Sequence, residues 1–253
     1  MIIFYFTGTG NSLSIAKRIG GKLISIPQVV DSSESFYKDD AIGIVFPVYG
    51  LAMPKMVRRF LEKAQFKANY TFVIGTCGNM AGIATMNAQK LALKNGYCFD
   101  YANTIRMVDN YLPMFKIEDE IAKLSGKKLE EKIAHIVEDI RNQKQNQTRG
   151  SLALRLTPMT NGVIKYNKFA ERYNVNDRCD ECGICSHVCP VKNISVHDKV
   201  NYGDNCAACL ACVHLCPKNA IHIKNEKSNM RWRNPEVLLE EIIAANNRFL
   251  PRK

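Results

Sequence analysis

Two rows of closely spaced cysteines constrain this 253-residue chain more than any other feature. The segments CDECGICSHVCP, which begins at Cys179, and CAACLACVHLCP, which begins at Cys206, each read C-x2-C-x2-C-x3-C-P. The similarity continues past each proline, so the stretch from Cys179 to Ile223 is an internal repeat. Cysteines gathered this closely are typical of metal sites or of disulfide frameworks.

The spacing favours iron–sulfur clusters. A 4Fe–4S cubane needs one thiolate for each of its four irons, and two-residue gaps let three thiolates of one tight loop reach the same cluster. The fourth cysteine of such a run, which precedes a proline, ligates the other cluster. Zinc does not explain why a third and a fourth cysteine recur at these spacings in both rows. Disulfides are typical of secreted chains, and nothing in the sequence indicates secretion. The expected ligands are, for one cluster, Cys179, Cys182, Cys185 and Cys216, and for the other, Cys206, Cys209, Cys212 and Cys189.

From about Val175 to Ile223 the chain resembles the bacterial two-cluster ferredoxins. The resemblance implies a small α+β domain that carries electrons at low potential, one electron per cluster. His187 and His214 occupy equivalent C-x-H-x-C positions in the two halves. We expect both to be exposed loop residues; the alternative is that, when protonated, they raise the potential of a nearby cluster by stabilising its reduced form.

A glycine loop, TGTGNS, follows the apolar N-terminal run MIIFYF and leads into a helical pattern. A loop between a strand and a helix presents free backbone N–H groups and the positive end of the helix dipole to an anion. It is not an ATP or GTP loop, because no lysine follows the glycines, and it is not a dinucleotide fingerprint, because Leu13 replaces the third glycine. The hydroxyls of Thr7, Thr9 and Ser12, together with backbone N–H groups, can hold a phosphate dianion without a cation.

Apolar, strand-like runs alternate with helical patterns over the first part of the chain. The expected strands are Ile2–Phe6, Leu23–Ile26, Ile42–Phe46, Tyr70–Ile74 and Tyr97–Met107. The expected helices are Ser12–Ile19, Lys55–Ala64, Ile83–Lys94 and a stretch within Glu118–Asn142 that is interrupted near Gly126. This alternation predicts an α/β domain with a parallel sheet covered on both faces, and ligands of such sheets bind at the carboxyl ends of the strands.

The glycine loop and the order of elements resemble the flavodoxins over about Met1 to Gln143. The resemblance implies a five-stranded parallel sheet of order 2-1-3-4-5 and an FMN whose phosphate lies in the first loop. Three loops are expected to bind FMN: Thr7, Gly8, Thr9, Gly10, Asn11 and Ser12; Pro47, Val48, Tyr49 and Gly50; and Thr76, Cys77, Gly78 and Asn79.

Individual roles follow from residue type. Tyr49 is expected to stack on the flavin ring, and Gly50 to let the backbone approach its edge. The third loop lacks the aromatic residue that many flavodoxins place on the outer ring face, so either the ferredoxin domain or the loop Asp109–Pro113 is expected to cover it. Cys77 is expected to be a small buried residue rather than a redox-active thiol.

The chain is therefore expected to contain four parts: residues 1–145 as the FMN-binding domain, 146–173 as a connector, 174–225 as the two-cluster domain and 226–253 as a helical tail. In the tail, Asn234 is expected to cap a helix whose first residue is Pro235, with Val237, Leu238 and Ile242 on one side.

The net charge of +11 raises the possibility of a nucleic-acid partner, but the basic residues are spread along the chain in short pairs. An acidic redox protein is the partner we expect, and nucleic-acid binding is not expected. The apolar start lacks a basic leader and a cleavage site, and the run Ala41–Pro54 is too short to span a bilayer. We expect a cytoplasmic protein without membrane insertion.

The combined layout resembles the flavodoxin–ferredoxin fusion proteins of anaerobes. The resemblance implies an oxygen-sensitive electron-transfer protein in which single electrons pass between two 4Fe–4S clusters and FMN, and onward to a redox partner. The alternative is a flavin-dependent reductase of a small-molecule acceptor, although the three loops contain no obvious general acid. Clusters that only hold a small domain together are a third, weaker possibility.

Overall fold

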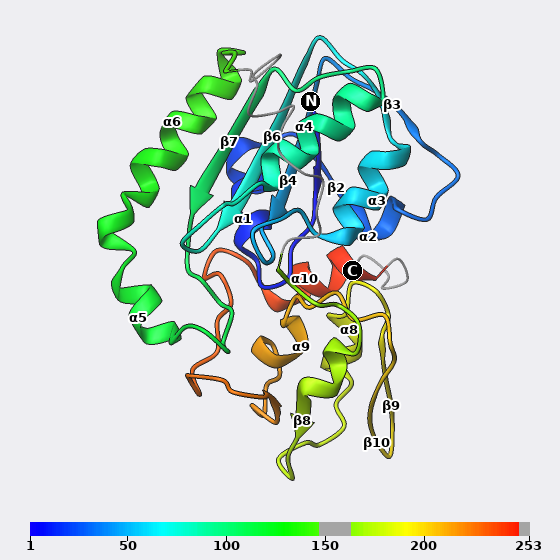
Figure 1. The fold of residues 1–253 in the computed structure, drawn as a ribbon, viewed down its shortest axis with the longest axis vertical. Helices are drawn as coiled ribbons and strands as arrows, with labels where there is room; N and C mark the ends of the chain where they lie inside the picture. The colour runs from blue at the N-terminus through cyan, green and yellow to red at the C-terminus, as the bar shows by residue number, and fades with distance from the viewer. Residues whose placement is uncertain (147–162, 248–253) are drawn as a thin grey trace.

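Five parallel strands form the centre of the N-terminal part in this computed structural model, which describes residues 1–146 and 163–247. They are β1 (Ile2–Tyr5), β2 (Lys22–Ser25), β4 (Ala41–Pro47), β6 (Tyr70–Cys77) and β7 (Tyr101–Arg106). Their order in the sheet is β2-β1-β4-β6-β7, and each neighbouring pair is parallel. Counted along the chain this order is 2-1-3-4-5, which confirms the expected flavodoxin-like fold (Figure 1).

Helices cover both faces of the sheet. They are α1 (Asn11–Ile19), α3 (Lys55–Lys63), α4 (Ala84–Lys94) and α6 (Leu129–Arg141). The helix α5 (Ile117–Ala122) and the 3-10 turn η1 (Ser125–Lys127) precede α6. Apolar residues of α1 and α6 pack on one face, and those of α3 and α4 pack on the other. The predicted interruption near Gly126 is present as η1.

Three short elements escaped the sequence analysis. The strands β3 (Phe36–Lys38) and β5 (Gln65–Lys67) form a separate parallel pair, and α2 (Ile26–Val29) follows β2 directly. All three are too short to show a periodic pattern. The predicted strand Tyr97–Met107 begins only at Tyr101, because Tyr97 and Phe99 pack edge to face beside Phe66 instead of joining the sheet.

The cysteine repeat folds into a second, smaller unit, residues 173–223, which we call the cysteine-rich unit. Its elements are β8 (Tyr173–Val175), α8 (Ile184–His187), β9 (Ile194–His197), β10 (Lys199–Tyr202), α9 (Ala211–His214) and β11 (Ile221–Ile223). β8 pairs antiparallel with β11, and β9 pairs antiparallel with β10. In Figure 1 this unit lies beyond the carboxyl ends of the parallel strands. The 3-10 turn η2 (Phe169–Arg172) leads into it, and residues 147–162 of the expected connector lie outside the described parts.

The backbone repeats as closely as the sequence does. Equivalent residues of the two cysteine loops adopt left-handed conformations, in the pairs Glu181 and Ala208, Gly183 and Leu210, and Lys192 and Asn219. Left-handed conformations are costly for residues other than glycine, so their recurrence indicates that the two loops have the same required shape.

The tail departs from its predicted form. Its helix, α10 (Leu239–Asn246), begins four residues after Pro235, and Leu238 is exposed rather than packed. The side-chain oxygen of Asn234 does accept the Glu236 N–H, 3.0 Å away, as a cap would, but only a turn follows it. The predicted helix start was wrong: the Asn234 backbone N–H donates to the carbonyl oxygen of Thr9, 2.8 Å away, so the segment follows the glycine loop. α10 then packs near α2, and the tail contacts both units (Figure 1).

Gly43 in β4 allows a test of the sheet packing. A Cβ at this position would lie 2.0 Å from the ring of Phe72, so Gly43→Ala should lower the free energy of unfolding by about 1–3 kcal/mol through overpacking. A urea titration followed by circular dichroism measures it. Gly126→Ala is the matched control, since nothing lies within 4 Å of its Cβ; equal midpoints for the two variants would contradict the packing.

Candidate functional site

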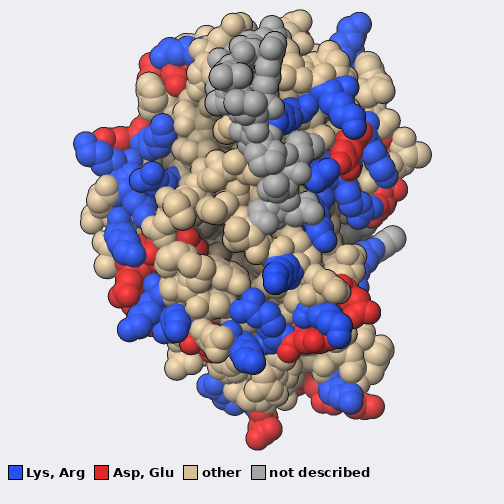
Figure 2. All heavy atoms as spheres, viewed as in Figure 1, with Lys and Arg blue, Asp and Glu red and all other residues tan. Residues whose placement is uncertain are grey.

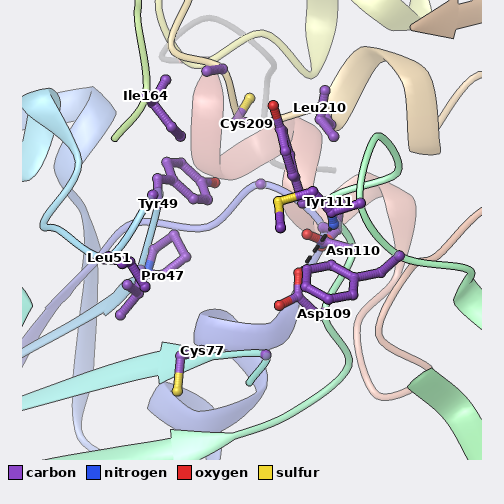
Figure 3. A pocket seen from close by; sticks show the side chains of 18 of the residues that line it. Pro47, Tyr49, Leu51, Cys77, Asp109, Asn110, Tyr111, Ile164, Cys209 and Leu210 are labelled. Atoms are coloured by element: carbon purple, nitrogen blue, oxygen red, sulfur yellow. Dashed lines mark hydrogen bonds between the residues drawn. The ribbon is translucent and has the colours of Figure 1, made fainter. Parts of the chain in front are cut away.

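A cavity of about 650 Å³ lies between the carboxyl ends of the parallel strands and the cysteine-rich unit. We call it the large cavity. Its walls come from the loops after β1, β4, β6 and β7, from residues 163–172, and from Ala208, Cys209 and Leu210. In Figure 3, Pro47, Tyr49 and Leu51 face Asp109, Asn110 and Tyr111 across it, with Cys77 on one side and Cys209, Leu210 and Ile164 on the other. Its volume falls within the usual range for cofactor and small-molecule sites.

Thirteen of the fourteen residues predicted to bind FMN line this cavity. The exception, Gly10, faces the tail: a Cβ there would lie 3.0 Å from Cβ of Asn234 and 3.1 Å from Cβ of Val237. Its φ of +100° also requires glycine. The three loops are thus brought together, and Gly10 is needed to let the tail pack against the first of them.

The glycine loop keeps hydroxyl protons available for an anion. The Thr7 hydroxyl oxygen accepts a hydrogen bond from the Gly10 N–H at 3.0 Å, and the Thr9 hydroxyl oxygen accepts one from the Asn110 side-chain amide at 2.6 Å. Because each oxygen already serves as an acceptor, each O–H proton remains to be donated to a ligand. Both side chains are at most 3% exposed, so a phosphate held here would be shielded from water.

The loop is held in place by residues that the sequence analysis did not assign to the site. The indole N–H of Trp232 and the side-chain amide of Asn234 both donate to the side-chain oxygen of Asn11, at 3.1 and 3.2 Å. No sequence motif marks these residues, and only the tail's path along the loop reveals them.

His214 does not lie on the surface as expected, although His187 does. His214 is 4% exposed; one ring nitrogen is 2.8 Å from the Asn110 carbonyl oxygen, and the other accepts the Trp232 N–H at 3.1 Å. Burial lowers the pKa of His214 to about 4, so the ring is neutral at physiological pH. It joins the cysteine-rich unit to the loop after β7.

Tyr49 and Gly50 lie in the cavity wall opposite the loop after β7. The Tyr49 ring packs edge to face with Phe6, at 6.1 Å between centroids, and burial raises the pKa of its hydroxyl well above the usual value. Gly50 has a φ of +55°, and a Cβ there would lie 2.5 Å from Cγ1 of Ile164. Ring stacking by Tyr49 stays a prediction. The positive φ and the close approach of Ile164 together account for glycine at position 50.

Both segments expected to cover the flavin reach the cavity. Asp109, Asn110 and Tyr111 come from the loop after β7, and Ala208–Leu210 come from the cysteine-rich unit. Arg172 links the two sides, because its guanidinium donates to the Tyr111 hydroxyl at 3.0 Å.

The eight repeat cysteines fall into the two expected sets. Cys179, Cys182, Cys185 and Cys216 line one small cavity, which we call the first cysteine cavity. Cys189, Cys206, Cys209 and Cys212 line another, the second cysteine cavity. Within the described residues, no three metal-ligating side chains converge as they would around a single ion. In a cubane each thiolate binds a different iron, so four thiols that line one small cavity are the set that the predicted cluster requires.

Backbone amides point at the fourth cysteine of each row. The Asn193 N–H donates to Sγ of Cys189 at 3.2 Å, and the equivalent Ala220 N–H donates to Sγ of Cys216 at 3.3 Å. Such bonds favour the thiolate. Burial acts in the opposite direction: it raises the pKa of Cys189, and it raises that of Cys185 to about 11. A thiol such as Cys185 therefore needs a bound cation to ionise near neutral pH.

Cys209 lines both the large cavity and the second cysteine cavity. It also borders the glycine loop, since a Cβ on Gly8 would lie 3.1 Å from the Cys209 carbonyl oxygen and 3.4 Å from its Cβ. No residue of the first cysteine cavity lines the large cavity. The two cysteine sets are therefore unequal: the second adjoins the predicted flavin site and the first does not.

The charge distribution gives no continuous basic stripe on the face in view. Figure 2 shows Lys and Arg scattered over it with Asp and Glu among them. Lys165, Lys168 and Arg172 lie in the wall of the large cavity. None of the helices in the described parts of the chain could cross a membrane.

Comparisons with known proteins give only distant structural likeness. No protein-family model matches the chain, and no curated protein matches it. A Bacteroides uniformis protein assigned as a flavoprotein superposes with a TM-score of 0.32 and 17% identity, over 42% of this chain and 88% of that one. Two-electron reduced Megasphaera elsdenii flavodoxin gives 0.31 and 17%, over 41% and 85%. The flavodoxin-like fold of the N-terminal part follows from the strand order itself.

The two cysteines outside the repeat should differ in reactivity. Cys77 is 5% exposed and burial raises its pKa to about 11, so roughly one thiol in a thousand is ionised at pH 8. Cys98 is half-buried. Iodoacetamide labelling of the native protein at pH 8, read by peptide mass spectrometry, should modify Cys98 and spare Cys77. Equal labelling rates would show that Cys77 is an accessible, activated thiol.

Proposed function

We propose that this protein relays single electrons between two 4Fe–4S clusters and FMN, and onward to a redox partner. The observation that carries the proposal is the position of Cys209, which lines both the second cysteine cavity and the large cavity. A cluster ligated there would be the neighbour of a flavin held by the three loops.

The large cavity suits FMN chemically. Its buried glycine loop offers backbone N–H groups and the free hydroxyl protons of Thr7 and Thr9, which are donors for a phosphate. The facing side chains of Tyr49 and Tyr111 offer aromatic surface for a flat ring. When bound, FMN supplies the exchange between two-electron and one-electron chemistry, since it accepts electrons in separable single steps.

The unequal exposure of the two cysteine sets supports an order of the proposed cofactors along the electron route. Cys182 of the first set is exposed, whereas in the second set Cys189 and Cys212 are buried, and Cys206 and Cys209 are half-buried. A redox protein would reach the first cluster at the surface, and the second cluster would connect it to the flavin. This route can run either way.

We propose an acidic redox protein as the partner, in keeping with the net charge of +11, and we do not propose nucleic-acid binding. The same proposal places the protein in the cytoplasm of an anaerobe, where thiols stay reduced.

One observation favours a second candidate function, the flavin-dependent reduction of a small acceptor. The large cavity extends to a rim with Lys165, Lys168 and Arg172, and the side chains of Met80 and Met114 beside it are 65% and 66% exposed. A small anionic acceptor could reach the cavity at this rim. Turnover of small acceptors by the reduced protein, with no requirement for a second protein, would favour this candidate.

The proposed cofactors can be assayed together. Protein purified without oxygen should contain two clusters' worth of iron and acid-labile sulfide and one FMN per chain. The proposal would fail if the folded protein held zinc in place of iron and sulfide, or could not take up FMN.

The phosphate cradle can be tested with Thr9→Ala. The variant loses one hydroxyl donor to a charged phosphate, which is worth about 1.5–3 kcal/mol, so FMN affinity should fall by roughly 10- to 100-fold. Riboflavin, which lacks the phosphate, should bind both proteins alike; isothermal calorimetry measures both ligands. Thr104→Ala, on β7 outside the cavity lining, is the matched control. An equal loss for both ligands would place the phosphate elsewhere.

A further inference from the structure

A carboxyl group without a cation lies in the wall of the large cavity. Asp109 follows β7, and Figure 3 shows its side chain across the cavity from Tyr49. Its carboxyl packs closely against the loop after β6: a Cβ on Gly78 would lie 2.1 Å from Oδ2 of Asp109. Its hydrogen bonds are long: the side-chain amide of Asn79 and the backbone N–H of Tyr111 each donate at 3.3 Å.

Two lysines whose charges act on Asp109, Lys123 and Lys127, form their ion pairs with another acid. Glu120 of α5 is fully buried and pairs with Lys123 at 2.6 Å and with Lys127 of η1 at 3.2 Å. Lys127 also donates to the carbonyl oxygens of Gly78 and Met107. Within the described residues, no cation lies at ion-pair distance from Asp109.

The charged and titratable groups around Asp109 do not balance a negative charge on its carboxyl. Glu120 repels a negative charge on Asp109, Lys127 attracts it from beyond ion-pair distance, and Cys77 of β6 is a neutral thiol at physiological pH. Burial, together with Glu120, raises the pKa of Asp109 above its usual value. In contrast, Lys123 and Lys127 help to hold the pKa of Glu120 below its usual value, so Glu120 keeps its charge.

We propose that Asp109 is the proton-binding group of the large cavity, and that its carboxylate takes up a proton from solvent when negative charge is added to the bound nucleotide. The inference rests on the proposed FMN site. An added negative charge in a site of low dielectric favours the neutral form of a nearby acid. Each electron enters from the clusters, and the proton taken up at Asp109 partly balances its charge; no covalent bond to the nucleotide changes in this step.

The consequence is a specific pH dependence. At low pH, Asp109 is neutral before and after reduction, so Asp109→Asn changes nothing. As pH rises through its titration, the wild-type carboxylate opposes reduction while the amide of the variant does not. The flavin potential of the wild type should fall progressively below that of Asp109→Asn, with a slope difference of up to one proton per flavin, and the difference should then level off.

The experiment is an anaerobic spectroelectrochemical titration of the FMN bands in the intact protein at several pH values. Asp119→Asn is the matched control: it is an exposed acid on α5 that makes the same charge change away from the cavity, and its profile should parallel that of the wild type. Parallel profiles for the wild type and Asp109→Asn overturn the inference while leaving the proposed function standing. A wild-type protein that cannot hold FMN overturns both.

Infrared difference spectra, reduced minus oxidised, give a second readout that needs no activity. Within the titration range the wild type should gain the C=O band of a protonated carboxyl, shifted in D2O, and Asp109→Asn should lack it. Should the variant lose FMN, the wild-type spectrum alone decides, because the absence of a gained carboxyl band contradicts the proposal.

Discussion

The contact between Cys209 and the glycine loop is the constraint on which the rest of the site depends. Gly8 can carry no side chain here, since its Cβ would lie 2.9 Å from the Tyr49 hydroxyl and 3.1 Å from the Cys209 carbonyl oxygen. This close approach brings a predicted cluster ligand to a predicted phosphate loop. It is the point at which the proposed cluster and the proposed nucleotide would be neighbours.

Several polar contacts hold that approach in register. The Asn234 backbone N–H donates to the Thr9 carbonyl oxygen in the glycine loop, and a ring nitrogen of His214 bonds the Asn110 carbonyl oxygen in the loop after β7. Further along the tail, the Ser25 hydroxyl donates to the Ala245 carbonyl oxygen, and the Asn246 amide donates to the Val188 carbonyl oxygen. Two neighbouring residues of the tail, Ala245 and Asn246, thus bond β2 of the sheet and the end of α8 in the cysteine-rich unit. The Ser25 and Asn246 bonds are buried, so breaking either leaves an unpaired polar group, and the relative position of the units is correspondingly costly to change.

Sequence reasoning succeeded where a local rule had a strong signal. Alternating strands and helices predicted the parallel sheet, and the resemblance to the flavodoxins implied its strand order. The cysteine spacing predicted the two sets of four that line two separate cavities. It failed where a residue's role depends on distant chain. Asn234 has the sequence of a helix cap, and its side-chain oxygen does accept the Glu236 N–H, but it also bonds Asn11 and Thr9, more than two hundred residues away. Asp109 lies in a loop with no motif, and its lack of a cation depends on Glu120 holding both lysines. No periodic pattern encodes such competition for partners.

The central claim is that electrons pass within one chain, between the cluster at Cys209 and the nucleotide in the large cavity. Transient kinetics after rapid photoreduction of the clusters tests it most directly, with the flavin bands followed at several protein concentrations. The account predicts a first-order transfer whose rate constant does not change with concentration. A rate proportional to protein concentration, or a flavin that stays oxidised while the clusters remain reduced, would contradict it.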